Sequence, residues 1–385
     1  MGGGGRFLIL HIKKLQQLGV FDVSQLKVIK YIPLPTNDVV VAAGLKKMFV
    51  GLKDLRQIQR WDLTKLELEL TVAAPEHGIV DMATGASVNG PLILVGEKRF
   101  WVVNPTTLKA ESYPSQHWGG DGSAWGPMHV HVSFDGSTVV ANGGGWAGVE
   151  TSNLVGNKVI NVQAGGYVNG EALVAGNGAL VFPDNGGILH SDLATSVKGI
   201  DGSPFPADDP AFSLSFRKDK EKPALILYSN ADPRPLVTMR DLPELAGNSK
   251  MPMWQRVHLI SRGHVLVTLG PGADKLMLRK FDLADELAAE GIDYLFVESA
   301  PPLNVEKGSR INYKMSVRSK KGGVKMELQS GPKGMTVSKD GVVQWAVPAR
   351  TEETHAMVII QVTDAAGQTI FHNFTVNIND VVSRR

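Results

Sequence analysis

The sequence predicts an all-β protein, and three observations support this. Glycine and proline are frequent, with 42 and 21 among 385 residues, and they divide the chain into short segments. Most of these segments alternate apolar and polar residues with the period of two that buries one face of a strand. Helical periodicity is confined to residues 284–290, Ala-Asp-Glu-Leu-Ala-Ala-Glu, which end at Gly291.

Composition excludes several classes of protein. Forty Lys and Arg against 38 Asp and Glu leave a net charge of +2, which gives no electrostatic reason for a nucleic acid or an anionic membrane as partner. Cysteine is absent, which excludes disulfides, thiolate metal sites and a cysteine nucleophile. No run approaches the about 18 consecutive apolar residues of a membrane-spanning helix. The G-x-S-x-G, H-E-x-x-H and P-loop motifs of enzymes are also missing.

A short landmark recurs along the first 300 residues. In its clearest copies an apolar residue precedes Asp, and Leu or Val followed by Ser or Thr comes after it. The acidic or amide residues are Asp22, Asp62, Asn104, Asn153, Asp192, Asp241 and Asp282, at intervals of 40, 42, 49, 39, 49 and 41 residues. A short side-chain oxygen at this position ends a strand and accepts hydrogen bonds from the backbone of the next turn.

Seven copies at this period resemble the blades of WD-repeat and YVTN-type β-propellers, with four strands per blade. The resemblance implies a seven-bladed β-propeller over residues 1–299. The first blade has room for only three strands, so its innermost strand is missing. That gap leaves an unpaired edge, which we interpret as a cut at the start of the chain unless the last blade donates a strand. The strands expected in the first three blades are residues 6–12, 16–21 and 28–32; 38–42, 47–51, 57–61 and 66–72; and 79–82, 92–95, 99–103 and 108–112.

Residues 300–385 are predicted to be a second domain. Ala300-Pro301-Pro302-Leu303 is typical of an extended linker, and the roughly 80 residues after it suffice for one small β-sandwich. The expected strands are residues 312–317, 325–328, 342–345, 357–362 and 371–378.

Two segments of this domain resemble the Ig and dystroglycan-type cadherin-like repeats of bacterial surface proteins. They are residues 331–345, Gly-Pro-Lys-Gly-Met-Thr-Val-Ser-Lys-Asp-Gly-Val-Val-Gln-Trp, and residues 362–367, Val-Thr-Asp-Ala-Ala-Gly. The resemblance implies an Ig-like sandwich with Met335 and Trp345 in its core and an extracytoplasmic location, although residues 1–12 show no signal-peptide pattern. It also implies a calcium site, for which the candidate ligands are Asp364, Asn379 and Asp380; the alternative is that Asp364 opens a turn.

Residues 117–131 contain candidate metal ligands. His129 and His131 lie two apart on a predicted strand, so their rings face the same side of the sheet. With His117 and Asp121 they form a set of imidazole and carboxylate groups suited to zinc or iron. The alternative is that the histidines are hydrogen-bonded structural residues.

Three tryptophans lie among glycines in the same region: Trp118, Trp125 and Trp146. An exposed indole offers an apolar platform with a polar edge, which suits a sugar ring or a peptide. The alternative is that these side chains fill the wedges between blades.

Two groups of charges are expected at the surface. Asp208 and Asp209, in the proline-rich loop 203–210, are expected to be solvated. Residues 217–222, Arg-Lys-Asp-Lys-Glu-Lys, are predicted to form an exposed hairpin tip.

These observations predict a non-enzymatic binding or scaffold protein that recognises a protein or a glycan through the loops of a propeller, with an Ig-like spacer. We assign no catalytic residue and expect no cofactor apart from calcium or a transition metal at the candidate sites. The alternative is a metal-dependent propeller hydrolase or lyase with His117, Asp121, His129 and His131 at the channel mouth. A third interpretation is a structural fragment of a larger surface protein.

Overall fold

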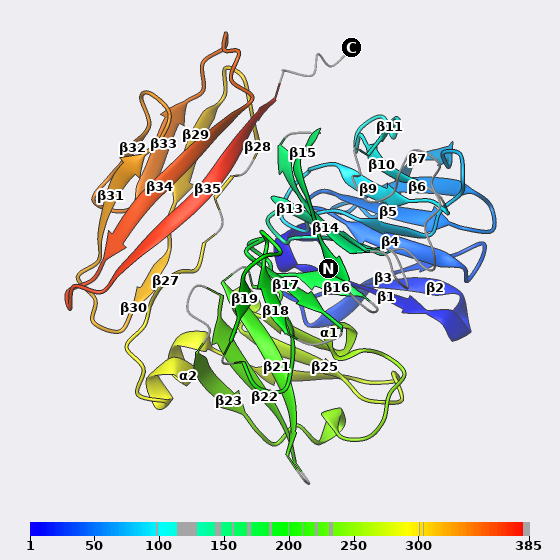
Figure 1. Ribbon diagram of the computed structural model, residues 1–385, viewed down its shortest axis with the longest axis horizontal. Coiled ribbons are helices and arrows are strands. Elements are labelled where there is room, and N and C mark those ends of the chain that lie inside the picture. Colours follow the sequence, from blue (N-terminus) through cyan, green and yellow to red (C-terminus); the bar gives the residue numbers. More distant parts are fainter. Residues whose placement is uncertain are drawn as a thin grey trace. The chain divides into compact units, whose positions relative to one another are not determined.

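The computed structural model describes the chain except for residues 98, 114–128, 143–147, 156–157, 168–170, 185–186, 199, 210, 220–221, 231–233, 300, 303 and 380–385. The chain divides into two compact units, residues 1–281 and 282–385 (Figure 1). Both units consist mainly of β-strands, which confirms the predicted all-β class. No helix in the described part of the chain is both long and apolar enough to cross a membrane.

The first unit contains, within its described residues, seven antiparallel sheets, each built from strands consecutive in sequence. The first three sheets comprise β1 (Phe7–Ile12), β2 (Gln17–Asp22) and β3 (Lys27–Pro33); β4 (Val39–Ala43), β5 (Lys47–Leu52), β6 (Gln57–Asp62) and β7 (Glu67–Ala73); and β8 (Asp81–Ala83), β9 (Leu92–Val95), β10 (Phe100–Val103) and β11 (Ala110–Ser112). These strands lie within two residues of the predicted ones, because alternating apolar residues and glycine-rich or Asp-rich turns are local signals.

The remaining sheets of this unit follow the same meander. They comprise β12 (His129–Val132), β13 (Thr138–Asn142), β14 (Gly148–Val155) and β15 (Lys158–Tyr167); β16 (Ala172–Val174), β17 (Leu180–Pro183), β18 (Ile188–His190) and β19 (Ser196–Val197); β20 (Ser203–Pro206), β21 (Phe212–Asp219), β22 (Lys222–Ser229) and β23 (Pro235–Met239); and β24 (Val257–Ile260), β25 (Val265–Leu269) and β26 (Leu276–Lys280). The short helices are η1 (Gly3–Gly5), η2 (Lys13–Leu15), η3 (Pro243–Leu245), α1 (Met253–Arg256) and η4 (Ser261–Gly263).

The sheets of the first unit form a closed ring. The first strands contact one another in sequence, β4 with β8, β8 with β12, β12 with β16 and β16 with β20, so these strands line the centre. The ring closes where the β1–β3 sheet packs against the β24–β26 sheet in one apolar cluster, whose buried members are Leu8, Phe21, Val23, Ile260, Val265 and Val267. A closed ring of antiparallel sheets is the architecture of a β-propeller.

The first sheet has three strands, as predicted, and its register shows which strand is missing. Phe7 lies opposite Asp22 in the β1–β2 ladder just as Lys47 lies opposite Asp62 in the β5–β6 ladder. The N–H of Gly2 bonds to the carbonyl of Phe7, as the N–H of Gly44, directly after β4, bonds to the carbonyl of Lys47. Strands β1–β3 therefore correspond to β5–β7, and Gly2 stands where the innermost strand of the other sheets would run.

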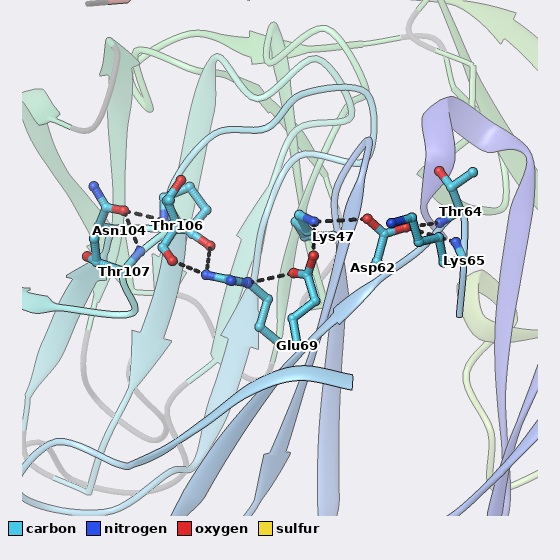
Figure 2. Close-up of polar contacts among 10 residues, drawn as sticks. Lys47, Asp62, Thr64, Lys65, Glu69, Asn104, Thr106 and Thr107 are labelled. Carbon is cyan, nitrogen blue, oxygen red and sulfur yellow. Dashed lines mark hydrogen bonds and ion pairs between the residues drawn. The ribbon is translucent and has the colours of Figure 1, made fainter. Parts of the chain in front are cut away.

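The landmark residues cap turns in most copies. Figure 2 shows Asp62 and Asn104, each of which accepts hydrogen bonds from the backbone N–H groups two and three residues further on, at 2.8–3.0 Å. Asp192 makes the same pair of bonds. Asp282 does so at the start of α2 (Leu283–Ala289), the helix predicted at residues 284–290. The landmark is therefore a physical device that turns the chain after a strand.

Two copies depart from this prediction. Asn153 lies inside β14, because its ladder with β15 shifts register after Thr151 and continues to Val155. Asp241 caps no turn among the described residues; it has a φ of 58° and leads into η3 through Pro243.

Ion pairs connect the landmark to its own sheet and to the next one. Lys47 lies between the carboxylates of Asp62 and Glu69, at 3.0 and 2.6 Å (Figure 2). Arg60 contacts Glu69 at 2.8 Å and donates to the backbone carbonyl of Thr106 in the β8–β11 sheet. Hydrogen bonds as well as apolar packing therefore hold these two sheets together.

In its described residues the second unit contains two larger sheets that share one core, and a two-stranded sheet, β27-β30. Its strands are β27 (Leu295–Val297), β28 (Asn304–Glu306), β29 (Arg310–Lys314), β30 (Val317–Ser319), β31 (Lys325–Ser330), β32 (Thr336–Val337), β33 (Val342–Ala346), β34 (His355–Thr363) and β35 (Thr369–Asn379). The larger sheets run in the orders β28-β35-β34-β31 and β29-β33-β32, and both contribute alternate residues to a core that contains Met335 and Trp345. The prediction that these two side chains are buried is confirmed.

Two details of the second unit concern the predicted boundaries. The single strand expected at residues 312–317 is divided into β29 and β30, because Met315 N–H bonds to Gly341 and Ser316 N–H bonds to Ser299 Oγ. Strand β27 pairs with β30, so backbone hydrogen bonds tie residues before the expected linker to residues after it. The domain boundary at residue 299 stays a prediction.

Asp22 provides a test of the capping landmark. Its buried carboxylate accepts bonds from Arg6, Ser24 and Gln25. Burial alone would raise the pKa of Asp22, but these bonds lower it from 3.8 to about 2. Asp22→Asn is therefore expected to lower the free energy of unfolding by about 2 kcal/mol at pH 7, measured by urea denaturation.

The pH dependence of the free energy of unfolding provides a second check on the role of Asp22. A carboxylate with a lowered pKa stabilises the fold above the pKa of the unfolded chain, so the difference between Asp22→Asn and the parent should shrink as the pH falls from about 4 to about 2. Asp192→Asn is the control: it removes the charge of an exposed carboxylate that has no ion pair among the described residues, but leaves an amide oxygen that can cap the turn as in Asn104, so it should cost less. An equal loss in both variants would contradict the assignment.

Candidate functional site

The two histidines predicted as ligands lie on β12, an inner strand of the propeller. Their side chains are partly exposed, at 37% for His129 and 21% for His131. Each ring meets a carboxylate from a neighbouring sheet: His129 Nδ1 lies 3.6 Å from Asp81 Oδ2, and His131 Nε2 lies 2.7 Å from Glu171 Oε1. The ring of sheets therefore brings together acids and imidazoles about 40 to 50 residues apart in sequence.

Asp81 is held rigidly at the start of β8. Its Oδ1 accepts the N–H of Met82 at 2.8 Å, and its Oδ2 accepts the N–H of Val130 at 3.2 Å. This carboxylate therefore connects two adjacent inner strands and fixes the ring of His129.

The electrostatics favour a charged His129. Its pKa is raised, first by the hydrogen bond to Asp81, against the opposing effect of burial, and further by the negative charges of Glu171 and Asp81. Because Glu171 bonds to His131 and also acts on His129, one carboxylate influences both imidazoles.

Trp254 of α1 completes the aromatic side of this site. Its ring lies 5.4 Å from that of His131, edge to face at 89°. Helix α1 leads into β24 in the last sheet, whereas β12 belongs to the fourth, so this contact spans the centre of the ring. Trp254 is not among the residues singled out from the sequence. The available signal was its position directly before an inner strand, because the candidate residues between 117 and 128 precede β12 in the same way.

The acids expected to be solvated are partly buried and bonded. His258 Nδ1 lies 3.0 Å from Asp208 Oδ2, and Ser261 Oγ donates to Asp209. The prediction was wrong because the proline-rich segment forms β20, an inner strand whose end meets β24 of the next sheet. A third imidazole–carboxylate pair thus belongs to the inner strands.

These pairs can orient imidazoles for binding or proton transfer. A carboxylate that accepts one ring N–H fixes the tautomer and leaves the other nitrogen available. In the part of the chain that the structure describes, no group of three or more His, Asp or Glu side chains is placed to hold a metal ion. His117, Asp121, Trp118, Trp125, Trp146 and Asp380 lie outside the described residues, as does the side chain of Asn379.

The tryptophan-bearing segments connect to the same end of one sheet. Residues 114–128 lead into His129, and residues 143–147 follow Asn142. His129 and Asn142 are direct cross-strand partners in the β12–β13 ladder. Both segments are therefore joined to the sheet beside the His129–Asp81 pair.

Asp364 caps a turn in the second unit. Its Oδ1 accepts the N–H groups of Ala366 and Gln368 at 2.9 and 3.0 Å, and its Oδ2 accepts the Ser319 hydroxyl at 3.1 Å. These bonds match the alternative that Asp364 opens a turn. The calcium site stays a prediction.

Comparisons with known proteins concern the fold. The chain is similar to the β-propeller domain of Cps50 (Swd1) from Myceliophteria thermophila, at 10% identity and a TM-score of 0.50, over 73% of this chain and 95% of that one. It is also similar to hydrazine synthase from Kuenenia stuttgartiensis, at 9% identity and a TM-score of 0.49 over 73% and 94% of the two chains. A third similar structure is the dihydro-heme d1 dehydrogenase NirN in complex with DHE, at 10% identity and a TM-score of 0.48 over 98% and 74%.

No family model matches the chain, and no curated protein sequence matches it either. At these identities the likeness to the Swd1 domain shows the fold alone, a β-propeller, and it agrees with the closed ring of sheets.

The pKa of His129 gives a test of the site. It is expected to exceed the ordinary value of about 6.5, and Asp81→Asn should lower it because the main stabilising hydrogen bond to the charged ring is lost. The measurement is an NMR titration of the imidazole resonances, with His129→Gln to assign the signal.

The stability of the fold should follow the same titration. A raised histidine pKa stabilises the folded state fully below about pH 6.5, and this contribution is lost as the pH rises through the raised value. The stability difference between the parent and His129→Gln should therefore narrow above neutral pH. An unchanged His129 titration in Asp81→Asn would contradict the pairing.

Proposed function

We propose that this protein is a non-enzymatic binding protein. Its first unit acts as a seven-bladed β-propeller whose first blade lacks the innermost strand, and its loop face recognises a protein or a glycan. The observation that carries the proposal is the cluster of Trp254, His131 and Glu171 at the centre of the ring.

The chemistry of this cluster suits a ligand whose surface is polar but uncharged. The indole of Trp254 offers an apolar face, and the imidazole–carboxylate pairs offer hydrogen-bond donors and acceptors in fixed orientations. Sugar rings and peptide backbones combine both properties. Trp118, Trp125 and Trp146 are proposed to extend the same surface, since their segments join the sheet beside His129.

The second unit is proposed to be an Ig-like spacer. Two sheets around a core with Trp345 and Met335, together with the resemblance to cadherin-like repeats, support this assignment. The same resemblance favours a location outside the cytoplasm.

The alternative is a metal-dependent hydrolase or lyase at the channel mouth. Three imidazole–carboxylate pairs on the inner strands, at 3.6, 2.7 and 3.0 Å, favour it, because such pairs serve as general bases and as oriented metal ligands. In this alternative His117 and Asp121 join His129 and His131 around the metal.

Binding is tested by probing arrays of glycans and of peptides with the purified full chain. Ligands found there should bind at least tenfold more weakly, by titration calorimetry, to Trp254→Ala and to the triple variant Trp118→Ala, Trp125→Ala and Trp146→Ala. Leu55→Ala, which truncates an exposed apolar side chain in the β4–β7 sheet, is the control and should bind normally. Equal binding by all variants would overturn the proposed surface.

The two functions are separated by thermal unfolding with Zn²⁺, Mn²⁺ or Ca²⁺ and after EDTA. A ligand at 100 times its Kd stabilises the fold by about 2.7 kcal/mol, which is a clear rise in Tm. The binding-protein proposal expects no rise with Zn²⁺ or Mn²⁺. A rise that His131→Ala abolishes would favour the enzyme, and a Ca²⁺ rise that Asp364→Asn abolishes would locate a metal in the second unit.

A further inference from the structure

A second candidate site lies within the first unit, apart from the channel. A cavity of about 380 Å³ opens between the β20–β23 sheet and the segment that joins this sheet to β24. Its volume is in the range of small-molecule sites. Lys218, Lys222 and Arg256 are its cationic lining residues, and none of the described lining residues is acidic.

Arg256 is the unusual member of this set. Its side chain is buried, with 3% of the residue exposed, and it donates from Nε to the carbonyl of Leu269 and from Nη2 to that of Glu244, at 3.0 and 3.1 Å. No described carboxylate pairs with it, and burial lowers its pKa. A guanidinium has five N–H donors, and burying its charge without an anion is costly.

The carboxylate of Glu244, whose backbone carbonyl Arg256 contacts, already has other partners. The carboxylate of Glu244 accepts bonds from Thr268 at 2.6 Å and from Arg279 at 2.8 and 3.1 Å. It therefore neutralises Arg279, while Arg256 reaches only the backbone carbonyl of Glu244. Among the described residues, no carboxylate compensates this positive charge at the cavity wall.

The lysines add positive charge at the cavity rim. Lys218 and Lys222 lie at the end of the β21–β22 hairpin, where the predicted exposed tip is found, and both are exposed. Neither makes an ion pair with a described carboxylate. Exposed lysines near an opening attract anions and raise their local concentration.

Much of the remaining lining is apolar and adaptable, and Asn248 and Ser249 add polar groups. Phe216, Leu245, Met251 and Met253 contribute to the cavity wall. Methionine side chains are flexible and polarizable, so they fit apolar groups of differing shape. The cavity therefore combines an apolar wall with a buried cation, which differs from a site for an inorganic ion.

We propose that this cavity binds a small organic anion, a carboxylate attached to an apolar chain or ring. Arg256 receives the carboxylate, Lys218 and Lys222 attract it, and the apolar part packs against Phe216, Met251 and Met253. The side chains that line this cavity differ from those of the proposed recognition surface, although Met253 and Arg256 share helix α1 with Trp254.

The test uses titration calorimetry of the full chain with octanoate, 1-octanol and inorganic phosphate as probes. Octanoate is expected to bind at least tenfold more tightly than either of the others. Its affinity should fall at least tenfold in the double variant Lys218→Glu and Lys222→Glu. The control Lys109→Glu changes an exposed lysine in the β8–β11 sheet and should leave binding unchanged.

A second variant tests the cavity itself without changing the lysines at its rim. Met251→Trp fills the cavity and should abolish octanoate binding while Tm stays near that of the parent. The proposal is overturned if octanoate does not bind, if 1-octanol or phosphate binds equally well, or if the double variant binds as the parent does. Arrays of glycans and peptides probe the channel surface, so failure here leaves that result intact.

Discussion

The closure of the ring between its first and last sheets is the contact on which the propeller depends. Leu8, Phe21 and Val23 meet Ile260, Val265 and Val267 in one buried cluster. The sheets that follow the first pack on neighbours through both faces, as the β4–β7 sheet does, whereas an open ring would expose an apolar face at each end. Closure of the ring places α1 opposite β12. The contact between Trp254 and His131 therefore depends on the packing of the first sheet against the last.

Two buried charges of the first unit, those of Asp22 and Arg256, are in different physical situations. The carboxylate of Asp22 is saturated by side-chain and backbone donors, and its charge stabilises a turn that recurs around the ring. The guanidinium of Arg256 has backbone partners but no anionic partner among the described residues. The bonds of Asp22 stabilise the fold. The charge of Arg256 indicates where a bound anion would act as the missing partner.

Local chemistry explains which expectations were met. Alternation and turn residues gave the strands of the first three sheets and the helix after Asp282, because these signals act over a few residues. The same pattern failed at Asn153, where the ladder with β15 determined where the strand ended. It failed again at Asp208 and Asp209, because a proline-rich segment was assigned to solvent when it forms an inner strand.

The sequence by itself determined the all-β class, the repeat of about 40 residues, the capped turns and the buried Trp345. Each depends on residues close in the chain or on a pattern of alternation. Only the tertiary structure decided that His129 meets Asp81, that His131 meets Glu171 and Trp254, and that Arg256 lines a cavity whose described residues include no acid. Those contacts join residues far apart in sequence, and the closure of the ring determines which of them meet.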